Sequence, residues 1–281
     1  MTDLSAFTPE RPLVLAGCGN MGRALLDGWL AAGLSTQAVF IVDPVLAEAG
    51  SGPAGIRCVK DVTELGEIAP GMVMLAVKPQ IMEKVAPGYI AMIQASGGTV
   101  ISIAAGIGMS SFEGWFGAET SIVRVMPNTP AAVGYGMSLL LKNASVSDET
   151  AALAELMLSA VGECLWVERE EQIDALVGVT GSGPAYVFLL IECIAAAAEK
   201  TGLTPEQAKL AARQTVLGSA VLADRQPDVD PAELRRRVTS PGGVTQAALD
   251  VLMAEGTGLP DMFPEAMEAG ERRNAELSGK A

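Results

Sequence analysis

Short runs of apolar residues recur through the first half of the chain, and most of them are followed by a stretch with helical spacing of apolar positions. Such runs have the length and composition of buried strands. They cover Leu13–Ala16, Ala38–Val42, Gly55–Cys58, Met72–Val77, Thr99–Ile103 and Ile122–Val125. Strands that alternate with helices in this way are typical of a parallel sheet with helices on both faces. The pattern therefore predicts an α/β fold built on a doubly wound parallel sheet.

The pattern changes after Glu168, where the strand signals end. Strands at Gly134–Leu141 and Gly162–Val167, with a helix around Glu149–Ser159 between them, complete the first domain. The helices expected beyond Glu168 are Ala185–Lys200, Pro205–Asp224, Pro231–Val238, Pro241–Glu255 and Pro260–Leu277. Proline is tolerated at a first helical position, which fits several of these starts. A chain of 281 residues can form two domains, and we expect an α/β domain over residues 1–168 and an all-helical domain over residues 169–281.

The helix that begins near Pro184 is apolar on nearly every side, through Val187–Ile191 and Ala195–Ala198. A helix of this kind must be buried all round, which a helical domain of roughly 110 residues can hardly achieve alone. We therefore expect a partner subunit; the alternative is a monomer that buries the helix against the first domain. The apolar run Ala185–Ala198 is interrupted by Glu192 and is short for a bilayer, so no membrane span is expected.

Composition narrows the class of protein further. Hydrophobic residues make up 49% of the chain and the formal net charge is −14, which argues for buried structure and against nucleic acid or an anionic membrane as partner. The four cysteines are scattered and histidine is absent, so no metal site of the Cys/His kind is expected. Reduced thiols and an N-terminus without the features of a signal peptide predict a cytoplasmic protein.

The first predicted strand ends in the sequence Gly-Cys-Gly-Asn-Met-Gly at 17–22, which leads into a helix. In such a turn Gly17 permits the sharp bend, Gly19 lets the backbone approach a phosphate, and Gly22 allows close packing of helix on strand. The free N–H groups and the dipole of the helix then face a pyrophosphate. The motif predicts a dinucleotide site, and the alternative is a glycine-rich turn without a ligand.

Asp43 ends the second predicted strand, roughly 20–30 residues beyond the first glycine, where a carboxylate accepts hydrogen bonds from the ribose hydroxyls of NAD. A carboxylate at this position repels a 2′-phosphate, so Asp43 favours NADH over NADPH. The alternative interpretation is a helix cap or turn residue ahead of Pro44.

A second candidate site lies at Ser240–Thr245. Ser240 is suited to cap a helix, Pro241 is suited to its first position, and Gly242 and Gly243 leave the first amides open. The start of such a helix can bind a small anion such as a carboxylate, and Thr245 adds a hydroxyl. The alternative is an ordinary capped helix.

Six stretches of the chain together resemble pyrroline-5-carboxylate reductase, the enzyme that makes L-proline. They are Gly-Cys-Gly-Asn-Met-Gly at 17–22, Ala-Val-Lys-Pro at 76–79, Ser-Ile-Ala-Ala-Gly at 102–106, Arg-Val-Met-Pro-Asn-Thr-Pro at 124–130, Gly-Ser-Gly-Pro-Ala-Tyr-Val-Phe at 181–188 and Ser-Pro-Gly-Gly-Val-Thr at 240–245. The resemblance covers nearly the whole chain. It implies a Rossmann domain followed by an all-α dimerisation domain that interleaves with a second subunit, in dimers that commonly assemble into decamers.

The resemblance also implies NADPH or NADH as the cofactor, with no metal. Together with the glycine loop and Asp43, it gives the residues expected to contact the cofactor: Gly17, Cys18, Gly19, Asn20, Met21, Gly22, Asp43, Ala76, Val77, Lys78, Pro79, Ile103, Ala104 and Ala105. Many members of the family have a neutral or basic residue where this chain has Asp43, and they use NADPH. Lys78 fits a role at the cofactor, and its alternative is a solvated loop lysine.

The implied substrate site is the loop that contains Ser240, Gly242, Gly243, Val244 and Thr245, where the carboxylate of 1-pyrroline-5-carboxylate would bind. Val244 stands where the family usually has Thr or Ala. The implied reaction is hydride transfer to the imine carbon. The imine nitrogen is basic enough to take its proton from water or one hydroxyl, so no histidine is required. Thr245 is the expected catalytic residue, hydrogen-bonded to that nitrogen.

Two other functions stay open at this point. A related reductase could act on another cyclic imine or on a small keto acid; the lysine that 3-hydroxyacid dehydrogenases carry on the long helix has no counterpart before Lys200. A non-catalytic nucleotide-binding regulator belongs to a different class and would have a damaged substrate loop, whereas both glycine-rich helix entries are intact here.

Overall fold

The computed structural model describes residues 4–50, 52 and 55–277. The chain forms two compact units, one made of Met1–Gly181 with Arg273–Ala281 and one made of Ser182–Arg272. Each unit has its own packing, and the last helix, α12 (Leu259–Leu277), contributes residues to both.

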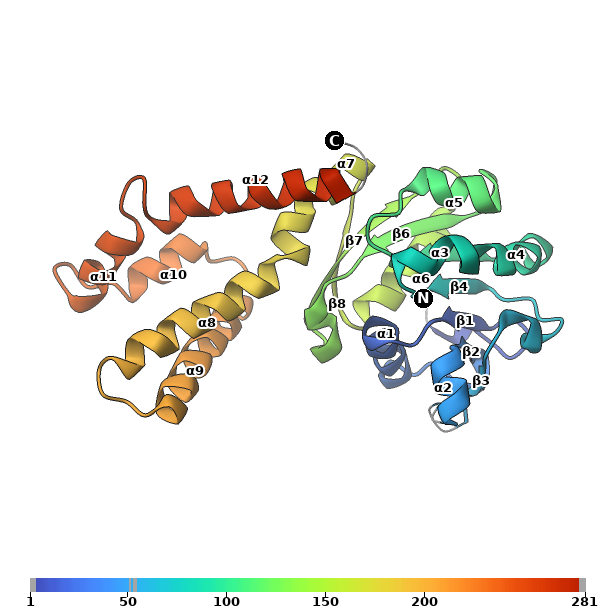
Figure 1. The fold of residues 1–281 in the computed structure, drawn as a ribbon, viewed down its shortest axis with the longest axis horizontal. Helices are drawn as coiled ribbons and strands as arrows, with labels where there is room; N and C mark the ends of the chain where they lie inside the picture. Colours follow the sequence, from blue (N-terminus) through green and yellow to red (C-terminus); the bar gives the residue numbers. More distant parts are fainter. Residues whose placement is uncertain (1–3, 51, 53–54, 278–281) are drawn as a thin grey trace. The chain divides into compact units, whose positions relative to one another are not determined.

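The first unit is built on one eight-stranded sheet (Figure 1), in the order β3-β2-β1-β4-β5-β6-β7-β8. The strands are β1 (Leu13–Ala16), β2 (Val39–Val42), β3 (Arg57–Val59), β4 (Met72–Leu75), β5 (Thr99–Ser102), β6 (Ile122–Met126), β7 (Gly136–Lys142) and β8 (Gly162–Trp166). The first six strands are parallel to one another. The predicted α/β sheet is confirmed.

The last two strands differ from the parallel sheet that the sequence predicts. β7 is antiparallel to β6, and β8 is parallel to β7, so the sheet is mixed. The connection from β6 to β7 holds only the short helix η5 (Thr129–Val133). A parallel crossover needs about a dozen residues or more, so this connection can only return the chain as an antiparallel neighbour.

Helices cover both faces of the sheet. They are α1 (Asn20–Ala31), α2 (Pro44–Ala49), α3 (Pro79–Val85), α4 (Ile90–Ser96), α5 (Met109–Phe116), α6 (Asp148–Ser159) and α7 (Glu170–Leu176). Alternate residues of β1 point to opposite faces: Leu13 and Leu15 pack in the core that includes α1 and α6, and Val14 and Ala16 pack in the core that includes α3, α4 and α5. The doubly wound arrangement thus follows from strands that are apolar on both faces.

The centre of the sheet contains a topological switch point. From β1 the chain builds β2 and β3 on one side, and it then returns to build β4, β5 and β6 on the other side. In such sheets ligands bind at the carboxyl ends of the strands beside the switch point. The glycine loop after β1 and the loop after β4 therefore lie next to each other at this end of the sheet, where the N–H of Ala76 donates to the carbonyl of Ala16 at 2.8 Å.

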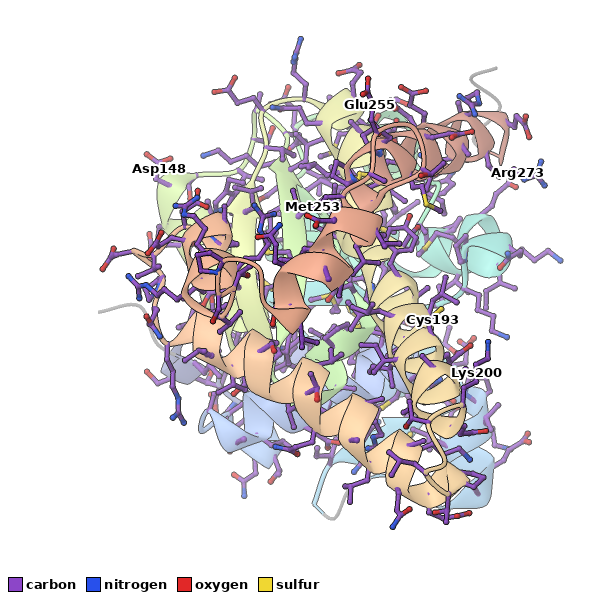
Figure 2. All side chains as sticks on the ribbon, turned by 90° about the vertical axis from the view of Figure 1, so that its left-hand side faces the viewer. Asp148, Cys193, Lys200, Met253, Glu255 and Arg273 are labelled. Atoms are coloured by element: carbon purple, nitrogen blue, oxygen red, sulfur yellow. The ribbon has the colours of Figure 1, made fainter. Side chains whose placement is uncertain are left out.

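The second unit is helical, as predicted. It contains α8 (Gly183–Glu199), α9 (Pro205–Asp224), α10 (Pro231–Arg237), α11 (Val244–Leu252) and most of α12. Helices α8 and α9 form a hairpin in which they lie side by side (Figure 1), and they bury the small residues Ala195, Ala208 and Ala212 between them. Cys193, which is exposed, and Lys200 lie along α8 and at its end (Figure 2).

Much of the apolar surface of α8 is uncovered in the single chain. Phe188 is 58% exposed and Leu189 is 57% exposed. Further large apolar side chains are exposed on the neighbouring helices, among them Leu210, Leu217, Val251, Met262 and Phe263. Exposed large apolar side chains in this number are typical of an interaction surface.

One helical stretch, Glu170–Glu199, is long and apolar enough to cross a membrane by length and composition. Only 6% of the most apolar part of this stretch is buried. The apolar run predicted from the sequence, Ala185–Ala198, lies within α8. In the structure the helical stretch is longer, because it also includes η6 (Val177–Gly181) and α7. A single helix of this kind is weak evidence for a membrane span, since core helices of soluble proteins meet the same criteria.

Candidate functional site

The glycine loop after β1 can be formed only by glycine at two of its positions. Gly17 has a φ of +87°, and a Cβ there would lie 2.8 Å from the carbonyl oxygen of Ala76. A Cβ on Gly22 would lie 2.4 Å from the carbonyl oxygen of Gly17. The sharp turn and the close packing of α1 that the sequence predicts are both present.

The start of α1 offers unpaired donors beside open space. A Cβ on Gly19 would meet nothing within 4 Å, and Gly19 caps α1 without a side-chain hydrogen bond. In the described part of the chain, no hydrogen-bond partner is found for the N–H groups of Gly19, Asn20, Met21 and Gly22. Unpaired N–H groups at a helix start, with the helix dipole behind them, form an anion site. The residues present therefore fit the pyrophosphate of a dinucleotide.

Asp43 ties the end of β2 to the glycine loop. One carboxylate oxygen accepts the N–H groups of Val45 and Leu46 at 3.0 and 3.1 Å and so caps α2. The other oxygen accepts the N–H of Cys18 at 2.8 Å. The interpretation of Asp43 as a helix cap is confirmed. The predicted ribose contact stays a prediction. The capping oxygen already accepts two N–H groups, so the oxygen that accepts the N–H of Cys18 is the one that retains a lone pair for it.

The remaining residues expected at the cofactor follow β4 and β5. Ala76 and Val77 are half-buried, and Lys78, which is exposed, immediately precedes Pro79 at the first turn of α3. After β5, the N–H of Ile103 donates to the carbonyl of Leu75 at 3.2 Å. Ala104 is buried and Ala105 is exposed. Because β1, β4 and β5 are parallel neighbours, their loops stand at one edge of the sheet.

Cys18 lies inside this loop but is not a nucleophile at neutral pH. Burial raises the pKa of its thiol to about 11, and the charge of Arg23 opposes that rise only in part. A thiol of such pKa stays protonated and unreactive.

The loop at Ser240–Thr245 is built differently from the prediction. The N–H of Gly243 donates to the carbonyl of Ser240 at 2.9 Å and Gly242 has a φ of +68°, so Pro241 and Gly242 form the middle of a β-turn. The helix α11 begins only at Val244, with Gly243 as its cap. The predicted roles of Ser240 as cap and Pro241 as first helical residue are therefore wrong, because the Pro-Gly pair favours a turn over a helix start.

The later start still leaves an open helix end. No hydrogen-bond partner is found among the described residues for the N–H groups of Val244, Thr245 and Gln246, or for the hydroxyl of Thr245. Val244 is 90% exposed, so its side chain covers nothing. The anion site predicted for this loop keeps its donors, although they stand two to three residues further along than expected.

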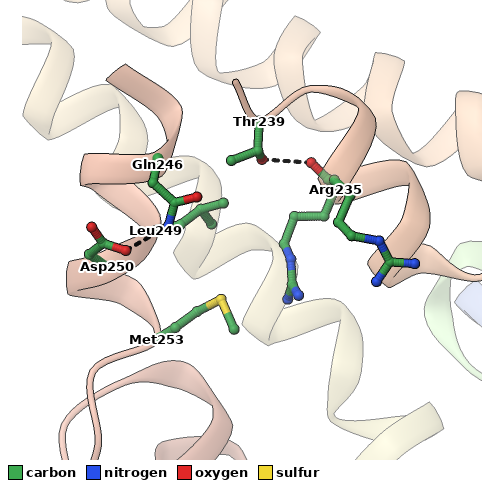
Figure 3. Close-up of a pocket in the computed structure, with 7 residues that line it drawn as sticks. Arg235, Thr239, Gln246, Leu249, Asp250 and Met253 are labelled. Carbon is green, nitrogen blue, oxygen red and sulfur yellow. Dashed lines mark hydrogen bonds between the residues drawn. The ribbon is translucent and has the colours of Figure 1, made fainter. Parts of the chain in front are cut away.

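A pocket of about 370 Å³ lies between α10 and α11, the two helices that this loop connects (Figure 3). Its walls are formed by Arg235, Arg236, Thr239, Gln246, Leu249, Asp250 and Met253. Thr239 donates to the carbonyl of Arg235 at 2.7 Å, and Gln246 donates to Asp250 at 2.7 Å. The sequence motifs did not include these residues; the run of three arginines at 235–237 was the available signal.

Comparison with known proteins gives the family. A family model described as pyrroline-5-carboxylate reductase dimerisation matches residues 170–277, and one described as NADP oxidoreductase coenzyme F420-dependent matches residues 13–106. A pyrroline-5-carboxylate reductase from Pseudomonas aeruginosa is 41% identical over 268 residues, which are 95% of this chain and 96% of that protein. The chain belongs to the pyrroline-5-carboxylate reductase family. The resemblance drawn from the six motifs is confirmed.

Solved structures of this reductase family share the fold. A pyrroline-5-carboxylate reductase from Coxiella burnetii superposes with a TM-score of 0.88 at 35% identity and covers 95% of this chain and 98% of its own. A pyrroline carboxylate reductase from Plasmodium falciparum, solved with NADP bound, gives a TM-score of 0.80 at 27% identity and covers 96% and 99%. The Rossmann sheet domain followed by a helical dimerisation domain, which the resemblance implied, is confirmed.

In this member of the reductase family, two further motif residues hold the segment that leads into α8. Asn128, after β6, donates to the carbonyl of Thr180 in the π-helix η6. Arg124 on β6 is buried and pairs with Glu170 on α7 at 2.6 Å, and Glu170 also accepts the N–H of Met109. In the sequence, Arg124 and Asn128 contributed only to the family resemblance, and no contact was predicted for either residue. Among the described residues, no group of three or more His, Cys, Asp or Glu is placed to hold a metal ion.

Proposed function

We propose that this chain reduces 1-pyrroline-5-carboxylate to L-proline, with a reduced nicotinamide dinucleotide as hydride donor. The observation that carries the proposal is the pair of open helix starts, at Gly19–Gly22 and at Val244–Gln246, in a member of a family whose relatives bear this name. One helix start fits a pyrophosphate and the other fits a carboxylate. The reaction needs both anions bound.

The cofactor, when bound, supplies the hydride, and the protein supplies its binding and orientation. The N–H groups of Gly19–Gly22 would hold the pyrophosphate, and Asp43 would accept the ribose hydroxyls. The loops Ala76–Pro79 and Ile103–Ala105 would line the nicotinamide half.

The substrate side rests on the loop of Ser240, Gly242, Gly243, Val244 and Thr245. The free N–H groups of Val244 and Thr245 would hold the substrate carboxylate, which fixes the ring in place. The hydroxyl of Thr245 would hydrogen-bond the ring nitrogen and orient it, since a threonine hydroxyl is a poor acid. The nitrogen then takes its proton from water, and orientation with exclusion of bulk water accounts for most of the catalysis.

NADH is the preferred form in this proposal, and NADPH is the second. The carboxylate of Asp43 is held by three backbone N–H groups, which keeps a negative charge fixed at the end of β2. A 2′-phosphate placed beside it meets like-charge repulsion. The Plasmodium falciparum relative, solved with NADP bound, supports the alternative.

The proposed assembly is a homodimer formed through the helices of residues 169–281, with further association into a decamer. The exposed apolar side chains of α8, α9 and α12 support it. The net charge of −14 supports a protein that binds neither nucleic acid nor an anionic membrane. The free cysteines support a cytoplasmic location.

Initial rates with pyrroline-5-carboxylate, measured in parallel with NADH and NADPH at matched concentrations, test the proposal. Faster turnover with NADH is the expected result. Faster turnover with NADPH keeps the reductase and reduces Asp43 to a helix cap. No turnover with pyrroline-5-carboxylate but turnover with another cyclic imine or a small keto acid identifies a related reductase. Tight nucleotide binding without any turnover identifies a regulator.

A further inference from the structure

We propose that Glu48 and Lys60 together set how strongly the cofactor site discriminates between the two nicotinamide dinucleotides. In this proposal Glu48 holds Lys60 in an ion pair and so withholds it from a 2′-phosphate. The inference rests on the proposed function, because it takes the end of β2 beside Asp43 as the place of the adenosine ribose. It concerns two residues outside the motifs of the family.

Lys60 follows the strand next to the one that ends in Asp43. β2 and β3 are parallel with Val42 opposite Val59, and the N–H of Asp43 continues the ladder by donating to the carbonyl of Val59 at 3.0 Å. Lys60 therefore stands at the carboxyl end of β3, at the level at which Asp43 stands at the end of β2. The end of β3, which carries Lys60, is therefore next to any group that binds at Asp43.

The ammonium group of Lys60 is already paired. Its Nζ lies 3.4 Å from a carboxylate oxygen of Glu48 on α2, the helix that Asp43 caps. The two side chains are 55% and 67% exposed, so the pair is weak and Lys60 is free to exchange partners. Together Asp43, Glu48 and Lys60 carry a net negative charge, which disfavours a phosphate beside them.

The other cations of this segment serve other contacts. From Asn20 to Asp61 the basic residues are Arg23, Arg57 and Lys60. Arg23 pairs with Asp27 at 2.8 Å within α1. Arg57 donates to the carbonyl of Glu64 and lies 5.8 Å over the ring of Phe40. Lys60 is thus the cation of this segment that stands beside Asp43 and could neutralise a 2′-phosphate.

The test measures the binding of the adenosine ends of the two cofactors to the full chain. Calorimetric titration with 2′,5′-ADP and with 5′-AMP gives two Kd values, and their ratio isolates the 2′-phosphate. In Glu48→Gln, which removes the charge and keeps the shape, the ratio is expected to shift about three- to tenfold toward 2′,5′-ADP. In the double variant Glu48→Gln with Lys60→Met, most of that gain is expected to disappear.

A matched control separates a local effect from a change in net charge. Glu119→Gln changes the net charge by the same amount. The exposed Glu119 precedes β6, so it lies at the amino ends of the parallel strands, whereas Asp43 and Lys60 lie at their carboxyl ends. Its ratio is expected to equal that of the unaltered protein.

Three results would overturn the inference. An unchanged ratio in Glu48→Gln removes the role of Glu48, and an equal gain in the double variant removes the role of Lys60. If the unaltered protein binds neither nucleotide, the cofactor site of the proposed function fails, and this inference fails with it. If the protein binds 5′-AMP and reduces pyrroline-5-carboxylate while Glu48→Gln leaves the ratio unchanged, only the inference is lost.

Discussion

The side-chain amide nitrogen of Asn128 donates a hydrogen bond to the backbone carbonyl of Thr180 at 2.9 Å. The oxygen of the same amide accepts the N–H of Met137, at the start of β7, at 2.8 Å. One side chain thus joins the loop after β6 both to β7 and to the π-helix η6. Irregular helical turns of this kind occur frequently at functional sites. The contact fixes η6 at the carboxyl end of β6, directly before the glycine-rich start of α8.

Asn128→Ala is expected to lower the free energy of unfolding by about 1–3 kcal/mol, because it leaves the carbonyl of Thr180 and the N–H of Met137 without a partner. Urea denaturation followed by circular dichroism measures the loss. The neighbouring Thr129→Ala is the control, since Thr129 is exposed, and a change within about 0.5 kcal/mol is expected there. Equal stability of the two variants would contradict the bridging role.

Arg124→Met is expected to destabilise the sheet domain by about 3 kcal/mol, because it leaves the carboxylate of Glu170 partly buried without its charged partner. The double variant Arg124→Met with Glu170→Gln is expected to recover part of the loss, since the glutamine oxygen can still accept the N–H of Met109. Thermal unfolding of both variants gives the comparison. Additive losses from the two substitutions would show that the pair is not coupled.

Alanine at Gly17 and at Gly19 is expected to act in different ways. Gly19→Ala places its methyl group in open space, so the melting temperature should change little while NADH affinity falls by about tenfold or more through loss of the phosphate approach. Gly17→Ala forces a side chain into a left-handed conformation against Ala76, so the melting temperature itself should fall. Unaltered NADH affinity in Gly19→Ala would remove this loop from the cofactor site.

Thr245→Ala is expected to lower kcat about 10- to 100-fold while the Kd for NADH changes less than about twofold, because in the proposed function the hydroxyl orients the ring nitrogen and does not hold the cofactor. Thr245→Ser keeps the hydroxyl and should retain most of the rate. Steady-state rates and NADH fluorescence titration give the two quantities. A kcat that survives the alanine substitution would remove Thr245 from the reaction.

Burial of Cys18 is expected to make the free energy of unfolding fall at alkaline pH. The pKa of this thiol is about 11 in the folded chain against an ordinary value of 9.0, so between these values the unfolded state loses the proton first. The free energy of unfolding is expected to be unaffected by this group below pH 9 and to fall as the pH rises toward 11. Urea denaturation at pH 8 and pH 10 measures the fall. In Cys18→Ala the fall should be smaller, and an equal fall would assign it to other groups.

The parts of the fold that the sequence predicts are those with local causes. The apolar residues of β1, the left-handed turn at Gly17 and the close contact at Gly22 follow from neighbours in the chain, so the glycine loop could be predicted residue by residue. The direction of β7 follows from the length of its connection to β6, which the alternation of strands and helices does not encode.

Two kinds of feature could not be predicted from the sequence. One is a segment whose residues suit two local conformations equally well, and the other is a contact between residues that are distant in the chain. Ser240-Pro241-Gly242-Gly243 suits both a capped helix and a β-turn, and the left-handed Gly242 selects the turn. The contact of Asn128 with Thr180 joins positions 52 residues apart and leaves no spacing signal. The same is true of Arg124 and Glu170, where a buried ion pair is visible only once the strand and the helix stand together.

The uncovered apolar side chains of the helical unit, such as Phe188 and Leu217, tie its folding to mass action. Where a second copy covers these side chains, the free energy of association is part of the free energy of folding, and it falls as the chain is diluted. A newly synthesised chain must therefore meet its partner before its C-terminal helices reach their final stability. The abundance of this protein in the cell thus contributes to how much of it is folded.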